Sequence, residues 1–294
     1  MERPGTRHCQ LGIRWTIGDV NPEGFEALQL SIYGAWSLFG SRACYQVCVN
    51  SVGVSQARQQ TGELPVEVEW REVSRADLPE FLRLGHTVAE GTGWKFCPLR
   101  AFERIPELAL DNDCILWSVP PALERWLQGA SAGLIAEDVR PHFGCFASRC
   151  GLAPRNSGIR GLAPEFPFEQ VLGELMREGR QLLTEGDEQG LQVACLQARG
   201  EPQVVPVSDV AICSPFPPHG QALGQCGAHF VGLNTKHFGW TYYGQDPVQL
   251  TRAYWRHIQP ALLEKLPGAQ SLQQERPLKD ARPGSQITGV RGPG

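Results

Sequence analysis

The sequence has no long apolar run and no excess of basic residues, and each absence excludes a class of protein. No apolar stretch is long enough to cross a bilayer, so we expect no integral membrane segment. The 27 Lys and Arg are outnumbered by 31 Asp and Glu, for a net charge of −4, which argues against a nucleic-acid-binding surface. Residues 1–10 contain no apolar core, so we do not expect a secretory signal there.

The ten cysteines form no C-x-x-C motif, and without paired spacing a zinc site is not expected. A disulfide framework is also disfavoured where no secretory signal is recognised. The cysteines are scattered through the chain, mostly in apolar surroundings, which favours buried thiols in a reducing compartment. The sequence therefore predicts a cytoplasmic protein.

The composition is that of a globular protein with a sizeable core. The 294 residues are 41% hydrophobic and 20% charged, enough for one large α/β domain or two small ones. No repeat or linker interrupts the body, whereas the chain after Pro267 is rich in Gln, Arg, Pro, Gly and Ser without apolar periodicity. We predict a flexible start (1–10), one domain (11–267) and a disordered tail (268–294).

The first part of the body has the pattern of a parallel α/β sheet. A short apolar run over 11–17 predicts a strand that ends at Gly18-Asp19. Pro22 then opens a helix that Gly40 ends, and its apolar residues recur at spacings of three and four: Phe25, Leu28, Ile32, Ala35 and Phe39. Strands over 45–49 and 66–73 follow, so the chain begins with a strand–helix–strand unit.

The remaining elements are predicted from the same patterns. Helices are expected over 76–84, 100–105, 120–126, 166–183 and 188–198. Strands are expected over 134–136, 204–212 and 229–233. Asp246 and Pro247 are a suitable cap and first residue for a last helix, whose apolar residues recur at four-residue steps to Leu266.

The most informative stretch runs from Glu107 to Trp117, where two carboxylates interrupt an apolar segment. A buried strand rarely tolerates two acids unless something neutralises them. Because residues i and i+2 point the same way on a strand, Asp111 and Asp113 are candidates to bind one divalent cation. The alternative is an ordinary turn, in which Asp and Asn are common.

Further segments occur in a suggestive order around this D-x-D motif. They are Lys95 upstream, then Ala136-Glu137-Asp138, Asn156-Ser157-Gly158, Asp187-Glu188-Gln189, and His229-Phe230-Val231-Gly232-Leu233-Asn234-Thr235-Lys236. Together they resemble the retaining glycogenin and lipopolysaccharide-galactosyltransferase family, over about residues 11 to 240. The sequence departs from that family in having one extra residue before Lys236, no Pro after it, and Glu188 where Asp is usual.

The resemblance implies a GT-A-like fold, with a Rossmann-like, mostly parallel central sheet flanked by helices in a single domain. It implies transfer of a sugar from a nucleoside-diphosphate sugar donor to an unknown acceptor. The implied metal ligands are Asp111, Asp113 and His229, and the imidazole favours Mn²⁺ over Mg²⁺. The implied catalytic residues are Gln189, Glu188 and Asp138. The implied substrate- and nucleotide-binding residues are Lys95, Asn112, Asn156, Gly232 and Lys236.

Two binding residues are also expected from position alone. Asp19 and Asn50 follow the first two strands, and ligands of parallel sheets bind beyond the carboxyl ends of the strands. We therefore expect both to lie near the nucleoside.

Other interpretations stay open from the sequence. A haloacid-dehalogenase-type phosphohydrolase also carries D-x-D after a strand, with its first Asp as nucleophile, and a non-catalytic sugar-nucleotide-binding protein could keep the same residues. Individually, His229 could be a core histidine, Lys236 a surface lysine, Asn156 a turn residue and Lys95 a side chain that extends to solvent. Trp240, Tyr242 and Tyr243 could form an aromatic rim for the acceptor.

Overall fold

The computed structural model describes residues 9–83, 93–177, 179 and 181–269. Its strands are β1 (Leu11–Ile17), β2 (Ala43–Val49), β3 (Glu69–Glu72), β4 (Glu107–Leu110), β5 (Cys114–Leu116), β6 (Gly133–Glu137), β7 (Arg155–Leu162), β8 (Gln203–Val205), β9 (Val210–Cys213) and β10 (Gly227–Phe230). Its α-helices are α1 (Pro22–Phe39), α2 (Val54–Thr61), α3 (Glu80–Arg83), α4 (Pro121–Leu127), α5 (Ala147–Cys150), α6 (Phe168–Met176), α7 (Glu185–Gln197) and α8 (Pro247–Lys265). Short 3₁₀ helices are η1 (Gly40–Arg42), η2 (Arg75–Asp77), η3 (Gly93–Phe96) and η4 (Gly144–Phe146).

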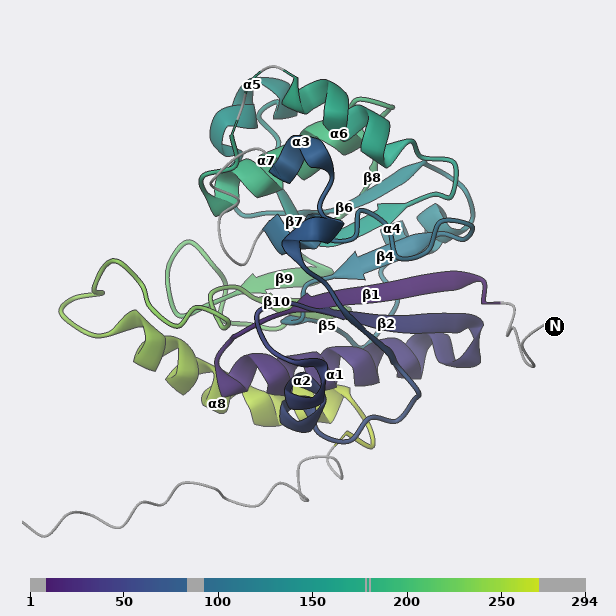
Figure 1. Cartoon of the computed structure of the whole chain (residues 1–294). Coiled ribbons are helices and arrows are strands. Elements are labelled where there is room, and N and C mark those ends of the chain that lie inside the picture. Colours follow the sequence, from purple (N-terminus) through teal and green to yellow (C-terminus); the bar gives the residue numbers. More distant parts are fainter. Residues whose placement is uncertain (1–8, 84–92, 178, 180, 270–294) are drawn as a thin grey trace, which may run out of the picture.

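Seven strands form the central sheet in the order β3-β2-β1-β4-β7-β6-β8. All neighbours pair in parallel except β7, which runs antiparallel to both β4 and β6. Helices α1, α2 and α8 gather at one side of the sheet, and α3, α5, α6 and α7 at the other (Figure 1). The predicted fold class, a mostly parallel α/β sheet with flanking helices, is confirmed.

A second sheet of three strands, in the order β5-β10-β9, determines where the late part of the chain meets the early part. β10 is antiparallel to β5, with His229 opposite Cys114. The amide of Phe230 also donates to the carbonyl of Asp113 at 2.9 Å. This pairing brings His229 to the end of the acidic segment.

The predicted apolar face of α1 is buried as expected, and all five of its periodic residues lie in the main core. The helix also approaches β5 closely, because a Cβ at Gly34 would lie 2.1 Å from the carbonyl oxygen of Leu116. Helix α8 begins at Pro247 behind its Asp246 cap, whose side chain accepts from the amide of Val248 at 3.0 Å. It packs on α1 through Trp255, which donates to Glu26 at 3.0 Å.

Two predictions of secondary structure were wrong, and one strand was not predicted. No helix forms over 100–105, because the Glu107 carboxylate accepts from the amides of Ala101 (2.5 Å) and Phe102 (2.9 Å) and so replaces helical hydrogen bonds. The strand expected over 204–212 is divided between β8 and β9, which belong to different sheets and are separated by a turn at Pro206. The segment 155–162, for which no strand was predicted, is β7.

Two helices have different bounds from those predicted. Helix α6 ends at Met176, well before residue 183. Helix α7 begins at Glu185 rather than Glu188, because Thr184 and Asp187 form a capping box at its start. The helix expected over 76–84 is divided into η2 and α3, and residue 84 lies outside the described residues.

The cysteine prediction was wrong at one pair. Cys9 and Cys44 form a disulfide, which ties the residue before β1 to β2. The other eight carry thiols, and seven of these cysteines are buried, whereas Cys145 is exposed. The predicted flexible start and disordered tail fall mainly on residues 1–8 and 270–294, which lie outside the described residues. In the described part of the chain, no helix combines the length and the apolar character that a membrane span requires.

Candidate metal centre and its cavity

A cavity of about 710 Å³ lies where several strands of the central sheet end. It is lined by residues just beyond β1, β2, β4 and β6, namely Asp19, Asn50, Asp111 and Asp138. These four strands run in the same direction, so the cavity is at their carboxyl ends, where α/β sheets place their ligands. All the site residues proposed from the sequence line this one cavity.

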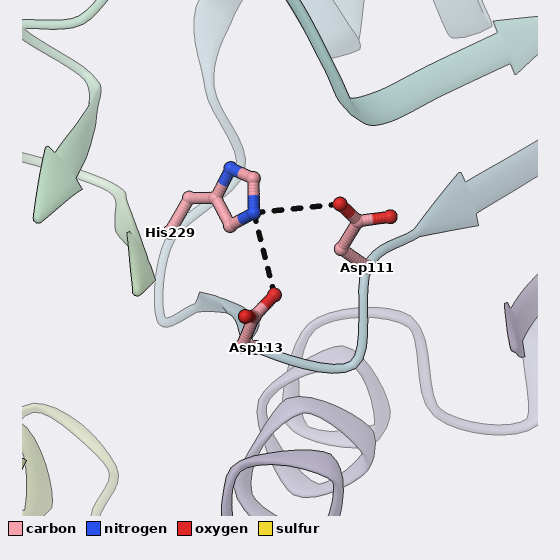
Figure 2. A group of neighbouring side chains, drawn as sticks. All are labelled: Asp111, Asp113 and His229. Carbon is pink, nitrogen blue, oxygen red and sulfur yellow. Dashed lines mark ion pairs between the residues drawn. The ribbon is translucent and has the colours of Figure 1, made fainter. Parts of the chain in front are cut away.

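Asp111, Asp113 and His229 converge on one point (Figure 2). His229 Nε2 lies 3.4 Å from Asp111 Oδ2 and 3.3 Å from Asp113 Oδ1, and one ligand atom from each residue lies within 4.8 Å of the others. Within the part of the chain that the structure describes, the buried Asp113 Oδ1 accepts no hydrogen bond, although His229 Nε2 lies 3.3 Å away. Two carboxylates and an imidazole with a buried, unsatisfied oxygen are a donor set that fits a divalent cation.

The two aspartates occupy a turn between β4 and β5 rather than a continuous strand. The amide of Cys114 donates to Asp111 O at 2.9 Å and closes the turn, while Asp111 N donates to Gly158 O on β7 at 2.9 Å. The turn and the metal site were alternatives in the sequence, and here the turn is what directs both carboxylates toward His229.

Asn112, between the two aspartates, faces the protein more than the cavity. Its amide donates to Gly24 O at 3.0 Å and exchanges hydrogen bonds with Asn234 at 2.8 and 3.0 Å. Asn234 also donates to Asp113 Oδ2 at 3.0 Å. These contacts anchor the turn to the start of α1 and orient the Asp113 carboxylate.

Gly158 is required by the position of His229. A Cβ at residue 158 would lie 2.4 Å from Cε1 and 2.5 Å from Nδ1 of the imidazole. Any side chain there would displace the ring or β7. Gly158 lies in the Asn156-Ser157-Gly158 segment, but nothing in the sequence connects it to a histidine on another sheet.

Lys95 extends from η3 into the cavity and pairs with two acids. Its Nζ lies 2.8 Å from Asp111 Oδ2 and 3.6 Å from Glu188 Oε2, and it donates to Ser157 Oγ at 3.4 Å. Lys95, which the resemblance implies as a substrate-binding residue, thus forms an ion pair with the first aspartate of the D-x-D motif, and its contact with a diphosphate stays a prediction.

The pKa shifts follow from this arrangement. Burial would lower the pKa of His229, but the carboxylates of Asp111 and Asp113 raise it to about 10. Burial opposes ionisation of Asp111, yet Lys95 and His229 hold the pKa of Asp111 well below its ordinary value. Burial raises the pKa of Glu188, against the effect of Lys95. The imidazole and the two carboxylates therefore favour each other's charged forms.

Glu188 and Gln189 are presented by the first turns of α7. Glu188 accepts from Ser157 Oγ at 3.4 Å and from Gln192. Gln189 accepts from Ser157 N at 3.3 Å and donates to His142 O at 3.1 Å. Both side chains are buried and held by the protein at the wall of the cavity.

Asp138 and Asn156 form a pair on the same wall. Asn156 Nδ2 donates to Asp138 Oδ2 at 3.1 Å, and Asn156 Oδ1 accepts from Gly158 N at 2.7 Å. Asn156 is part of β7, so its interpretation as a turn residue was wrong. The pair directs polar atoms toward the cavity from two neighbouring strands.

The part of the cavity beside Asp19 and Lys236 is more open to solvent. Lys236 Nζ lies 2.5 Å from Asp19 Oδ1, and the two side chains are 47% and 60% exposed. Asn50 accepts from Ser51 Oγ at 2.6 Å. Gly232 has a φ of 83°, a left-handed conformation that suits glycine.

Sequence reasoning missed a buried network of charges beneath the metal centre. Glu107 lies 3.7 Å from Arg14 and 3.5 Å from Arg160, and Arg160 donates to Gln192 Oε1 at 2.9 Å. Gln192 in turn donates to Glu188. The signal was a single charged residue within each apolar strand, Arg14 in β1 and Glu107 in β4, since a buried charge needs a partner.

Solved structures of three glycosyltransferases are similar to this chain. Mouse xyloside xylosyltransferase 1 is 15% identical, over 70% of this chain and 88% of its own, with a TM-score of 0.45. The bifunctional glycosyltransferase WbbM is 13% identical, over 90% of this chain and 53% of its own, with a TM-score of 0.47. The galactosyltransferase LgtC, solved with donor and acceptor sugar analogues, is 12% identical, over 84% of this chain and 95% of its own, with a TM-score of 0.45.

No protein-family model and no curated protein matches the sequence. At these identities the likeness to solved structures concerns the fold alone. The roles of individual residues rest on the geometry of the cavity.

Proposed function

We propose that this chain is a metal-dependent glycosyltransferase that moves a hexose from a nucleoside-diphosphate sugar to an acceptor, with retention of anomeric configuration. Residues 11–267 form its catalytic domain. The observation that carries the proposal is the convergence of Asp111, Asp113 and His229 in a cavity at the carboxyl ends of the strands. A buried carboxylate oxygen without a hydrogen-bond partner supports a cation at this point.

The chemistry explains why such a site needs these charges. Breaking the bond between the sugar and the diphosphate leaves negative charge on the departing phosphates. A divalent cation held by Asp111, Asp113 and His229 would supply Lewis-acid stabilisation of that charge. Mn²⁺ suits an imidazole ligand better than Mg²⁺ does, since Mg²⁺ prefers oxygen ligands.

The two lysines supply further positive charge to the diphosphate. Lys95 lies beside the ligand cluster and is held there by Asp111 and Glu188. Lys236 lies in a more exposed part of the cavity, where Asp19 pairs with it. Asp19 and Asn50 are then placed to contact the nucleoside, beyond the ends of β1 and β2.

The sugar occupies the wall formed by Asp138, Asn156, Glu188 and Gln189. Asp138 and Asn156 hydrogen-bond its hydroxyls. Gln189 lies at the reacting face of the sugar. Its side chain is held in one orientation by hydrogen bonds with Ser157 N and His142 O. The retaining outcome is tested by ¹H NMR of the product, because the anomeric coupling constant reports whether configuration is kept.

The central experiment measures donor binding by calorimetry with a panel of UDP-, GDP-, CDP- and ADP-sugars, with and without MnCl₂. We expect binding of one donor that requires the metal and is abolished in Asp113→Ala while the protein stays folded. Glu72→Ala, which removes an exposed acid on β3, is the matched control and should bind as wild type does. Unchanged Mn²⁺-dependent affinity in Asp113→Ala would reject the proposal.

Assays of phosphate release and of product formation, run beside the binding experiment, separate the competing functions. A phosphohydrolase would form an acyl-phosphate burst at Asp111 and release phosphate. A non-catalytic binder would bind the donor without forming product. The participation of His229 from a distant strand favours shared metal binding over a single nucleophilic aspartate.

A cytoplasmic location is part of the proposal, and the cysteines bear on it in two ways. Eight thiols suit a reducing compartment, whereas the Cys9–Cys44 disulfide suits an oxidising one. Counting free thiols in protein isolated from fractionated cells would decide between them.

A further inference from the structure

Five aromatic side chains form a cluster that belongs to none of the hydrophobic cores. We call it the aromatic cluster, and its members are Phe216, Phe238, Trp240, Tyr242 and Tyr243. Ring centroids of Phe216 lie 5.0 Å from Trp240 and 5.2 Å from Tyr242, in edge-to-face geometry. Trp240 is 46% exposed and Tyr243 is 89% exposed, so the cluster presents aromatic surface to solvent.

Tyr243 has a backbone conformation that is unusual for a bulky residue. Tyr242 and Gln245 exchange two backbone hydrogen bonds of 3.0 Å, which close a turn over Tyr243 and Gly244. Both turn residues have positive φ, 48° and 77°. Turns of this kind favour Asn-Gly, and a bulky residue at the first position is strained. Strain at an exposed aromatic residue indicates that its ring has a role outside the core.

The aromatic cluster comes from two segments, one with Phe216 and one with Phe238 to Tyr243. Both segments contact residues that line the cavity. A Cβ at Gly232, which lines the cavity, would lie 3.3 Å from the ring of Phe238. The amide of His219, another lining residue, donates to Phe216 O at 3.1 Å. The two segments follow β9 and β10, whose loops extend from the same side of the molecule (Figure 1).

We propose that the aromatic cluster is an acceptor subsite that binds a neutral pyranose ring by stacking on Trp240 and Tyr243. This inference rests on the proposed function, since an acceptor must lie beside the donor sugar. Pyranose rings expose C–H groups on one face, which pack on aromatic rings while the hydroxyls stay in water. The stretch from Phe238 to Gln245 contains no charged residue, which favours an uncharged sugar over a phosphorylated or acidic one.

The test uses the full chain with Mn²⁺ and four probes: methyl β-D-galactopyranoside, methyl β-D-glucopyranoside, lactose and maltose. Saturation-transfer NMR measures the affinity for each. We expect at least one probe to bind the wild-type protein, and its affinity to fall about two- to tenfold in Trp240→Ala and in Tyr243→Asn. Leu152→Ala removes an exposed apolar side chain that does not line the cavity and should leave the affinity unchanged.

Tyr243→Asn separates binding from a structural role. Asn adopts positive φ more readily than Tyr, so the melting temperature should stay constant or rise while the sugar affinity falls. A ring needed only for folding would instead lower the melting temperature. No binding of any probe to the wild-type protein, or equal affinities in all variants, would overturn the acceptor subsite.

The failure of this inference is distinguishable from failure of the proposed function. Metal-dependent donor binding and slow donor hydrolysis should be unchanged in both aromatic variants, because Trp240 and Tyr243 do not line the cavity. If donor binding is intact but the variants bind sugars as wild type does, only the acceptor subsite is wrong. If the wild-type protein binds no donor, the glycosyltransferase itself is wrong.

Discussion

Two similar pairs of charged residues line the cavity in very different surroundings, and we call their places the metal end, at Asp113 and His229, and the exposed end, at Asp19 and Lys236. At the metal end, the side chains of Asp113 and His229 are only 5% and 7% exposed, so little water screens the interaction between their charges. At the other end, Asp19 and Lys236 form a closer pair but are about half exposed. Because water and salt screen the exposed pair, distance alone does not rank the two interactions. We therefore expect substitutions at the metal end to reduce activity and metal affinity far more than substitutions at the exposed end.

The largest effect is expected for Asp111→Asn. This change removes the negative charge of one proposed metal ligand, which also pairs with Lys95 at 2.8 Å, without altering side-chain size. We expect donor turnover to fall about 10²- to 10³-fold, as when a buried electrostatic contact to a transition state is lost. Steady-state kinetics at saturating MnCl₂ would measure it. A decrease in turnover of less than threefold would contradict the expectation that charges at the metal end contribute more than those at the exposed end.

A smaller loss is expected for Gly158→Ala, which tests the buried end without removing a ligand. The added Cβ would lie 2.4 Å from the His229 ring and displace it. We expect Mn²⁺ affinity, measured by calorimetry, to fall about 10- to 100-fold, the usual effect of disturbing a ligand's support. Gly53→Ala is the matched control, since no atom lies within 4 Å of a Cβ there. Equal affinities for the two variants would show that His229 is not a ligand.

Asp187→Asn extends the comparison to a buried carboxylate outside the metal cluster. Burial opposes ionisation, but hydrogen bonds from Cys145, Thr184 and Leu183 lower the pKa of Asp187 to about 2. Because this folded-state pKa is below the unfolded value of about 3.9, the ionised group stabilises the fold above pH 4, and this is lost as pH falls toward 2. Urea unfolding should show a loss of roughly 2 kcal/mol at pH 7 that shrinks at pH 3. A loss independent of pH would indicate a purely steric effect.

The smallest effect is expected for Lys236→Ala at the exposed end. The free energy of unfolding should change by less than about 0.5 kcal/mol, because exposed ion pairs contribute little. Donor affinity should fall by a few fold at low salt, and the difference should decrease as NaCl is raised. Calorimetry at two salt concentrations would measure both. A salt-independent loss as large as that of Asp111→Asn would show that Lys236 acts from a desolvated position in the complex.

Local patterns predicted the elements that the chain forms from nearby residues. β1, α1 and β2 have clear signals, since α1 carries a regular apolar face and ends at a glycine. The last helix was predictable for a similar reason, because Asp246 and Pro247 determine its first turn. By contrast, β7 contains two glycines, two arginines, an asparagine and a serine, and it becomes a strand only because β4 and β6 pair with it on both sides.

The candidate site divides in the same way. The spacing of Asp111 and Asp113 was enough to predict that their carboxylates lie close together, and a turn brings them there. The support of the site was not predictable: Gly158 makes room for His229, and Asn234 orients Asp113. These contacts join residues from different sheets, and neither partner has a local signal that identifies the other.

By itself, the sequence determined three things: the residue types of the site, the strand–helix–strand unit that opens the chain, and the position of the acidic turn. These depend on hydrophobic periodicity, capping and chain spacing, which act over a few residues. Tertiary structure alone decided that β10 pairs with β5 and so places His229 beside the turn. It also decided which charges are buried, because burial depends on packing among segments far apart in the chain. The strength of each charge pair follows from that packing and not from the residue types.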